Sequence, residues 1–258
     1  MMNNNDLKKI CDDLIDTFFF AGNKAIELRK AGLKEKIKPD NTPVTNGDLE
    51  VNDILTKKIK SITPDIPIVS EESDTNKLLI NLSKFWLIDP IDGTYDYVNN
   101  KDEFTLNAAL IINKQPQLGI IYAPAKKRLF YTYGFGHSFE LSDKKKIGLN
   151  CKKKTKKKQI RAVSYSQDLK PVIADFHKLL GVTEHIKMKS SLKFCVIATG
   201  EFDLYVAEPR ASEWDIAAGH AILKNAGGII TDFEGKNIEY GKKDFKNTSL
   251  ILKRSLEL

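Results

Sequence analysis

The chain has 258 residues, of which 41% are hydrophobic and 29% charged, and its formal net charge is +7. This composition is typical of a globular protein of one domain, and no stretch approaches the roughly 20 apolar residues that a membrane span needs. The three cysteines, Cys11, Cys151 and Cys195, form no CxxC pair. This argues against a disulfide framework or a zinc site and favours reduced thiols in a cytoplasmic protein.

The N-terminal part predicts two helices and then a run of strands. Apolar residues recur at helical spacing over residues 7–29 and again over 48–61. Between them, "KIKPDNTPVTNGD" has the composition of a loop. Short strands are expected at "IPIVSEE" and "FWLID". Next come "TLNAALIIN", "QLGIIYAP" and "RLFYTYG", which predict an antiparallel meander that "HSFELS" extends.

The C-terminal part alternates strands with helices. The expected strands are "IRAVSYS", "HIKMKSS", "FDLYVAE", "GIITDF" and "SLILK", and the expected helices cover residues 168–180, 192–198 and 214–225. Alternation of this kind indicates α/β layering. The chain is therefore expected to be an α-β-α-β-α sandwich with two sheets. We expect a single domain over residues 1–258, with one lobe over about 1–142, a lysine-rich loop over about 143–158 and a second lobe over about 159–258.

The lysine-rich loop holds nine lysines between Lys144 and Lys158. Blocks of like charge are usually solvated, but the segment could instead contact an anionic surface. No aromatic residue is interleaved with these lysines, which argues against a stacking platform for single-stranded nucleic acid. We expect no nucleic-acid partner, and peripheral attachment at the inner face of a membrane stays open beside a plain cytoplasmic location.

The stretch "WLIDPIDGTYDY" places two carboxylates, Asp89 and Asp92, at the end of an apolar strand. Three residues apart on a regular strand, they would face opposite sides. Pro90 and Gly93 predict a turn that brings them together. Two adjacent carboxylates repel each other unless a cation lies between them. Magnesium suits such a site, because it prefers oxygen ligands and binds carboxylates and a substrate phosphate at the same time.

A helix that begins at Gly93 and Thr94 would aim its free N–H groups at the same place, which is a phosphate site. These features together suggest phosphoryl transfer or hydrolysis. The alternative is a capped turn with surface acids. Further acidic groups stand at strand ends or helix starts, namely Asp48, Glu71, Glu72 and Asp215. Asp48 and Asp215 could also be plain helix caps, and the two glutamates could be solvated.

Several motifs together resemble the inositol monophosphatase-like phosphatases, which depend on magnesium and are inhibited by lithium. The motifs are "TPVTNGD", "SEES", "DPIDGT" and "WDIAAGHAILKNAGG", in this order, and the resemblance runs from about Lys36 to Gly235. Within this group, "SSLKFCVIATGEFDLY" looks most like the bacterial 3'(2'),5'-bisphosphate nucleotidases. The resemblance implies a sugar-phosphatase fold and removal of the 3'-phosphate of adenosine 3',5'-bisphosphate, giving AMP and phosphate.

The resemblance also implies roles for individual residues. Two or three magnesium ions are expected, with Glu71, Asp89, Asp92 and the carbonyl of Ile91 as ligands and Asp215 joining Asp92 on a second ion. Adjacent side chains on a strand face opposite ways, so only one of Glu71 and Glu72 can face a metal, and motif position favours Glu71.

The remaining implied roles concern catalysis and the substrate. Asp48 and Thr94 orient and deprotonate the attacking water, with Glu71 beside them, and the amides of Gly93 and Thr94 hold the phosphate. Ser191 and Lys193 meet the second phosphate or the base. Asp92 and Asp215 border the bound substrate.

Three positions depart from the nucleotidase pattern. Tyr165 and Gln167 stand where those enzymes often carry arginine and histidine, and Lys189 stands where they typically have glycine. An inositol or other sugar-phosphate monophosphatase therefore remains an alternative function. A third alternative is a protein that binds RNA or membranes and has a vestigial phosphatase site. The presence of every expected acidic residue, Asp48, Glu71, Asp89, Asp92 and Asp215, argues against it.

Overall fold

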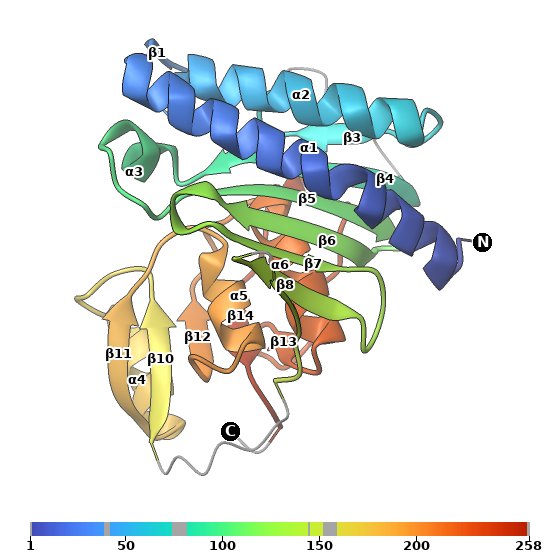
Figure 1. Cartoon of the computed structure of the whole chain (residues 1–258). Coiled ribbons are helices and arrows are strands. Elements are labelled where there is room, and N and C mark those ends of the chain that lie inside the picture. Colours follow the sequence, from blue (N-terminus) through green and yellow to red (C-terminus); the bar gives the residue numbers. More distant parts are fainter. Residues whose placement is uncertain (1, 39–41, 74–81, 144, 152–158, 257–258) are drawn as a thin grey trace.

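The computed structural model describes residues 2–38, 42–73, 82–143, 145–151 and 159–256. Figure 1 shows its layers: two long helices, a large sheet, a pair of inner helices, a smaller sheet and an outer helix. The predicted α-β-α-β-α sandwich is confirmed. Among the described residues, no helix combines the length and the apolar character that crossing a membrane requires.

The two long helices, α1 (Asn4–Ala31) and α2 (Asn46–Ile62), cover one face of the large sheet (Figure 1). Both follow the predicted apolar spacing, since α1 buries Leu14 and Phe18 and α2 buries Leu55 in the same core. The expected loop between them is partly wrong. It contains a two-stranded antiparallel hairpin of β1 (Glu35–Ile37) and β2 (Pro43–Thr45), while residues 39–41 lie outside the described residues.

The large sheet has seven strands in the order β3-β4-β5-β6-β7-β8-β9, with β3 parallel to β4 and every other pair antiparallel. The predicted meander is confirmed, including its extension by β8. The strands are β3 (Ile68–Ser70), β4 (Lys84–Asp92), β5 (Thr105–Ile112), β6 (Gln115–Ala123), β7 (Arg128–Thr132), β8 (Ser138–Ser142) and β9 (Lys145–Gly148), and a 3-10 turn, η2 (Pro124–Lys126), joins β6 to β7.

Strand β9 corrects the expectation of a loop over 143–158, because residues 145–148 pair with β8 at the sheet edge. All four residues of β9 are exposed, so no apolar alternation marked them as a strand. Of the nine lysines, only Lys145 and Lys146 belong to the described residues, and both lie in β9.

The inner helices, α5 (Leu192–Ala198) and α6 (Glu213–Asn225), fill the space between the sheets and match their predicted positions. Small residues let α6 approach α5 closely. A Cβ atom on Gly219 would lie 2.3 Å from Cγ of Phe194 in α5, so a larger residue there would push the two helices apart.

The smaller sheet has five strands in the order β11-β10-β12-β14-β13. Its strands are β10 (Ile160–Ser164), β11 (Val182–Lys187), β12 (Leu204–Ala207), β13 (Ile229–Thr231) and β14 (Leu250–Lys253), and a 3-10 turn, η3 (Lys243–Phe245), precedes β14. Helix α4 (Pro171–Leu179) covers the outer face, where Ile173 and Phe176 pack on the sheet. Its helix begins at Pro171, three residues later than predicted, because proline is favoured at the first helical position.

The acidic end of β4 is shaped by a bulge rather than by the expected turn. Asp89 pairs with Asn107 of β5, whereas Asp92 pairs with Thr105, so three steps along β4 match two along β5. The extra residue reverses the alternation of side chains. Asp92 therefore comes to the same side as Asp89 while the strand continues, and the short helix α3 (Thr94–Val98) begins directly after Gly93.

Candidate active site

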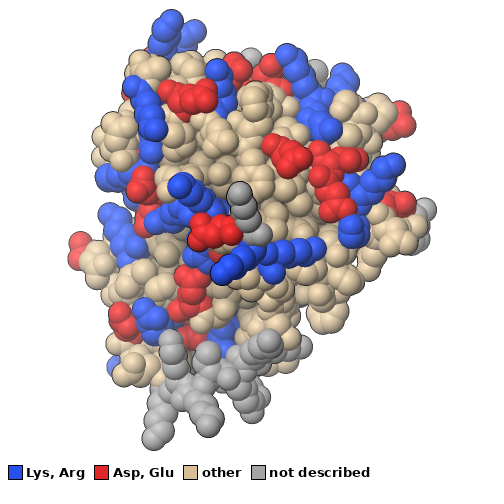
Figure 2. Space-filling model, in the orientation of Figure 1, with Lys and Arg blue, Asp and Glu red and all other residues tan. Residues whose placement is uncertain are grey.

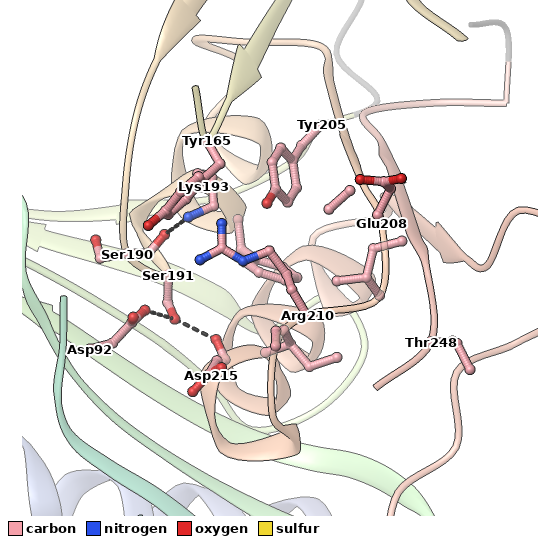
Figure 3. A pocket seen from close by; sticks show the side chains of 15 residues that line it. Asp92, Tyr165, Ser190, Ser191, Lys193, Tyr205, Glu208, Arg210, Asp215 and Thr248 are labelled. Atoms are coloured by element: carbon pink, nitrogen blue, oxygen red, sulfur yellow. Dashed lines mark hydrogen bonds between the residues drawn. The ribbon is translucent and has the colours of Figure 1, made fainter. Parts of the chain in front are cut away.

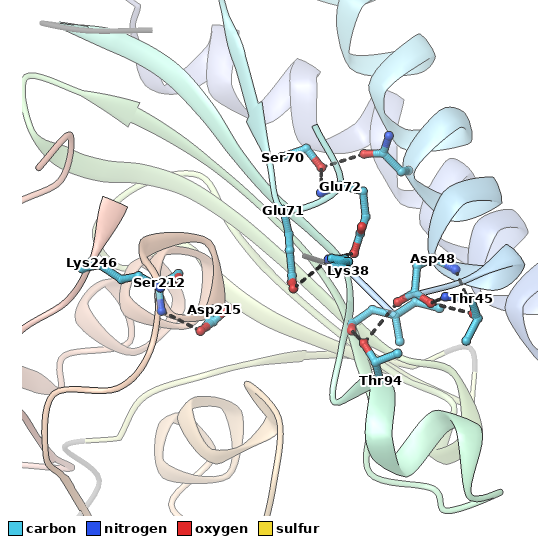
Figure 4. A network of polar contacts seen from close by, with 12 residues as sticks. Lys38, Thr45, Asp48, Ser70, Glu71, Glu72, Thr94, Ser212, Asp215 and Lys246 are labelled. Atoms are coloured by element: carbon cyan, nitrogen blue, oxygen red, sulfur yellow. Dashed lines mark hydrogen bonds and ion pairs between the residues drawn. The ribbon is translucent and has the colours of Figure 1, made fainter. Parts of the chain in front are cut away.

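Acidic side chains from four elements converge near the C-terminal ends of β3 and β4. Asp89 lies in β4. Glu71 follows β3, Asp48 lies in the first turn of α2, and Asp215 lies in the first turn of α6, as Figure 4 shows. A carboxylate oxygen from each of Glu71, Asp89 and Asp215 lies within 4.8 Å of the other two. The structure thus brings together residues that are up to 144 positions apart in the chain.

This cluster has the properties of a cation site. Asp89 is 1% exposed, and its Oδ1 atom is buried without a hydrogen-bond partner among the described residues. Burial raises the pKa of Asp89 and of Asp215 well above the ordinary range, and the neighbouring carboxylates raise both pKa values further. Burial likewise raises the pKa of Glu71. Three carboxylates, one buried and two half-buried, with an unsatisfied acceptor oxygen fit a hard divalent cation such as magnesium.

Lys38 was not anticipated, and it pairs with both glutamates beside the cluster, more closely with Glu72. Its Nζ atom lies 2.7 Å from Oε1 of Glu72 and 3.4 Å from Oε1 of Glu71. Glu72 is therefore drawn to the lysine, and only Glu71 reaches Asp89 and Asp215. Burial, opposed by Lys38, raises the pKa of Glu72 to about 7. In the sequence, Lys38 is marked only by its position in the polar segment before "TPVTNGD".

Asp92 lies beside this group of three and is tied to Ser191. The Ser191 hydroxyl donates to Oδ2 of Asp92 at 2.6 Å, also contacts the carbonyl oxygen of Asp215, and accepts a hydrogen bond from Nδ2 of Asn107 at 3.0 Å. Ser191 thus joins β4 to α6 across the site. Asp215 lies near Asp92 as well as near Glu71, since both carboxylates raise its pKa, and the sharing of a second ion by Asp92 and Asp215 stays a prediction.

Asp48 uses its two carboxylate oxygens for different purposes. Oδ2 accepts hydrogen bonds from the backbone N–H and the hydroxyl of Thr45, at 2.7 and 2.6 Å, which completes a capping box at the start of α2. Oδ1 is free of the cap and lies 3.2 Å from Oγ1 of Thr94. Asp48 is 1% exposed, and burial raises its pKa. The helix-cap interpretation and the catalytic one are therefore compatible.

The turn after β4 presents backbone groups to the site. Gly93 has φ +94°, and a Cβ atom there would lie 2.9 Å from the carbonyl oxygen of Glu103, so glycine is required. In the described part of the chain, no hydrogen bond is found for the N–H groups of Gly93 and Thr94. The Ile91 carbonyl accepts a hydrogen bond from the Thr94 hydroxyl at 3.1 Å.

A pocket opens directly beside Asp92 and Asp215 (Figure 3). Lys193 lines it and is only 7% exposed, so it is not the surface lysine that its helix position allowed. Burial lowers the pKa of Lys193 to about 8. Other lining residues were not singled out from the sequence, and those with polar side chains are Ser190, Tyr205, Glu208, Arg210 and Thr248.

The three positions that depart from the nucleotidase pattern lie differently. Tyr165 lines the pocket. Gln167 does not line it, and its carbonyl oxygen lies 3.0 Å from Nε2 of His185. Lys189 reaches toward α3, where its Nζ lies 3.2 Å from Oδ1 of Asp96. Tyr165 therefore lies where it can contact a substrate, whereas Gln167 and Lys189 do not line the pocket.

Comparison with known proteins adds three findings. A model described as the inositol monophosphatase family matches residues 12–257. The 3'(2'),5'-bisphosphate nucleotidase CysQ of Buchnera aphidicola subsp. Acyrthosiphon pisum is 34% identical over 244 residues, which cover 92% of this chain and 89% of the relative. The enzyme of the same name from Salmonella typhimurium is 33% identical over 209 residues, 80% of this chain and 83% of the relative.

Among solved structures, the chain is similar to CysQ from Bacteroides thetaiotaomicron, which is described as a bacterial member of the inositol monophosphatase family. The TM-score is 0.77 at 27% identity, and the match covers 93% of this chain and 95% of the other. Sequence and fold therefore agree on the same relatives.

Proposed function

The chain belongs to the inositol monophosphatase family, and on this premise we propose that it is a magnesium-dependent phosphatase that removes the 3'-phosphate of adenosine 3',5'-bisphosphate. The observation that carries the proposal is the cluster of Glu71, Asp89 and Asp215 beside a pocket that contains a buried cation, Lys193. Acidic groups suit the metals, and the lysine suits a second anionic group on the substrate. The relatives that are named as bisphosphate nucleotidases support this choice.

In the proposed site, Glu71, Asp89 and Asp215 hold magnesium, with Asp92 and the Ile91 carbonyl as further ligands. The chemistry that magnesium supplies when bound is activation of the attacking water and stabilisation of charge on the phosphate and the leaving oxygen. Ser191 keeps Asp92 and the start of α6 in register, so its role includes positioning as well as the predicted contact with substrate. Two or three ions would complete the set.

Asp48 and Thr94 provide a route for the proton of the attacking water. When the Thr94 hydroxyl donates to Oδ1 of Asp48, its lone pairs can accept a hydrogen bond from water. Attack on phosphorus then forms one P–O bond and breaks the bond to the 3'-oxygen. The water's proton passes through Thr94 to Asp48, and the leaving oxygen takes a proton from solvent. The free amides of Gly93 and Thr94 stabilise the phosphate oxygens.

The structure lends no support to a binding protein with a vestigial site. On the face shown in Figure 2, basic and acidic side chains are interspersed, which does not favour one anionic surface as a partner. Seven of the nine lysines in the lysine-rich segment lie outside the described residues. Peripheral membrane contact through that segment therefore stays a prediction.

The test is phosphate release by the purified protein, with magnesium, from adenosine 3',5'-bisphosphate and from inositol 1-phosphate. We expect a large preference in kcat/KM for the bisphosphate. Asp92→Asn should abolish the activity, which excludes a contaminating phosphatase, whereas Asp53→Asn, in an exposed pair with Lys57, should leave it intact. A preference for inositol 1-phosphate would replace the nucleotidase proposal with that of a sugar-phosphate monophosphatase.

A further inference from the structure

Arg210 is the cation that the sequence analysis did not single out. It lines the pocket beside Asp92 and Asp215, and its guanidinium carbon lies 3.4 Å from the centre of the Tyr165 ring. Figure 3 shows the guanidinium of Arg210 and the amine of Lys193 pointing into the same part of the pocket. Stacking on the ring leaves the N–H groups at the edge of the guanidinium available to a ligand.

Neither cation forms an ion pair with a carboxylate among the described residues, although Asp92 and Asp215 lie near Lys193. Within the described residues, Arg210 makes no ion pair and no hydrogen bond, and the nearby Glu208 is instead paired with Lys170, at 2.5 Å. Lys193 is buried, and its only hydrogen bond within the described residues goes to the carbonyl oxygen of Ser190. Lys193 is a buried cation without an ion pair, which is costly unless an anion binds beside it, and the exposed Arg210 at the same pocket has its guanidinium available to that anion.

The ring that carries Arg210 is itself fixed to the catalytic side of the site. The Nζ atom of Lys189 lies 5.8 Å from the centre of the Tyr165 ring and 4.8 Å from that of Tyr95. The same atom pairs with Asp96, which is buried in α3 two residues after Thr94. A continuous series of contacts thus runs from α3 through Lys189 and Tyr165 to Arg210.

This series explains two departures from the nucleotidase pattern as one arrangement. A tyrosine replaces an arginine at position 165, and the structure supplies an arginine from position 210 onto its ring. Lys189 stands where the resemblance leads us to expect glycine, and its amine lies over the Tyr165 ring and pairs with Asp96 of α3. The pocket therefore has an arginine at its edge, which comes from the segment between β12 and α6.

We propose that Arg210, positioned by Tyr165 and Lys189, binds the second phosphate of the substrate, the one that is not hydrolysed. This inference rests on the proposed nucleotidase function, because only a bisphosphate places an anion at the far side of the pocket while its other phosphate lies at the carboxylate cluster. Arg210 is then a specificity-determining residue, and Tyr165 is a positioning residue that acts through it.

The test compares adenosine 3',5'-bisphosphate with adenosine 3'-monophosphate, which shares the reacting phosphate but lacks the second one. We expect Arg210→Met to lower kcat/KM for the bisphosphate by roughly 10- to 100-fold, mainly through KM, as for loss of a charge-assisted hydrogen bond. Turnover of the monophosphate should change by less than about twofold. Arg161→Ala removes a matched arginine stacked on Phe202 outside the pocket and should leave both substrates unaffected.

The positioning role of Tyr165 is tested by a double-mutant cycle. Tyr165→Leu should raise KM for the bisphosphate alone, and it should add nothing once Arg210→Met is present, because its effect passes through the arginine. Additive losses would overturn that role. Equal losses on both substrates, or no loss, would overturn the role of Arg210. A wild-type protein that prefers inositol 1-phosphate to the bisphosphate would instead overturn the proposed function, and the inference with it.

Discussion

The metal-free protein should become more stable when Asp89 is replaced by asparagine. The three clustered carboxylates place oxygens within 4.8 Å of one another. At an effective dielectric constant of about 20, each ionised pair therefore repels by at least about 3.5 kcal/mol. Protons or metal ions must relieve this repulsion. Asparagine keeps the shape of the side chain and removes the charge from the member of the cluster that is buried most completely.

The pH dependence follows from the direction of the pKa shift. Because burial raises the pKa of Asp89, the folded protein holds a proton that the unfolded chain releases above about pH 4. Stability of the metal-free protein therefore falls as pH rises from about 4 toward the raised pKa. At about pH 8 we expect Asp89→Asn to unfold with a free energy about 2 kcal/mol higher than wild type, or roughly 4–8 °C higher in Tm. Near pH 4 the difference should vanish.

The assay is thermal unfolding in EDTA and in magnesium across this pH range. Magnesium should raise the Tm of the wild type and leave that of Asp89→Asn nearly unchanged, since only the wild type retains the full ligand set. Asp203→Asn is the matched control, because Asp203 is a buried carboxylate already paired with Arg254 at 2.6 Å, and its loss should destabilise with or without metal. The reasoning is refuted if Asp89→Asn melts at or below the wild type in EDTA at every pH.

Three further predictions concern the proposed reaction. Thr94→Val should lower kcat by about 100-fold or more while leaving Tm within a few degrees, because it interrupts the proton path to Asp48. Single-turnover phosphate release measures this rate, and an unchanged rate would contradict the proposed path. Since burial lowers the pKa of Lys193 to about 8, the lysine loses its charge as pH rises through that value. KM for the bisphosphate should therefore increase above about pH 8 in the wild type, and a titration of KM should show no such increase in Lys193→Gln. Lithium should inhibit turnover by competing with magnesium, so inhibition should weaken as magnesium is raised; full activity at saturating lithium would argue against the expected second metal position.

The elements that the sequence predicted well are those in which burial follows a regular period. Helix α1 buries residues three or four positions apart from Leu7 to Ala25, and the strands of the meander carry long apolar runs, so local spacing was sufficient. The hairpin β1–β2 and the edge strand β9 were missed. Strands β1 and β9 are exposed at every residue, and such strands exist only because a neighbouring strand pairs with them.

The candidate site was likewise predicted only in part from the sequence. Motifs pointed to Asp48, Glu71, Asp89, Asp92 and Asp215, because carboxylates at strand ends and helix starts suit metal and phosphate chemistry. Lys38 and Arg210 carry no such pattern, since a single lysine or arginine is common on any surface. Their roles depend on contacts with Glu72 and Tyr165, which lie 34 and 45 positions away in the chain.

The sequence by itself determined the chemical inventory of this protein: which oxygens could bind a metal, and which layers of helix and strand could form. Only the tertiary structure decided how that inventory is used. The bulge in β4 turns Asp92 to the side of Asp89, Lys38 pairs closely with Glu72, and packing of α6 brings Asp215 to Glu71. Each outcome depends on pairing between segments distant in the chain, which local periodicity does not encode.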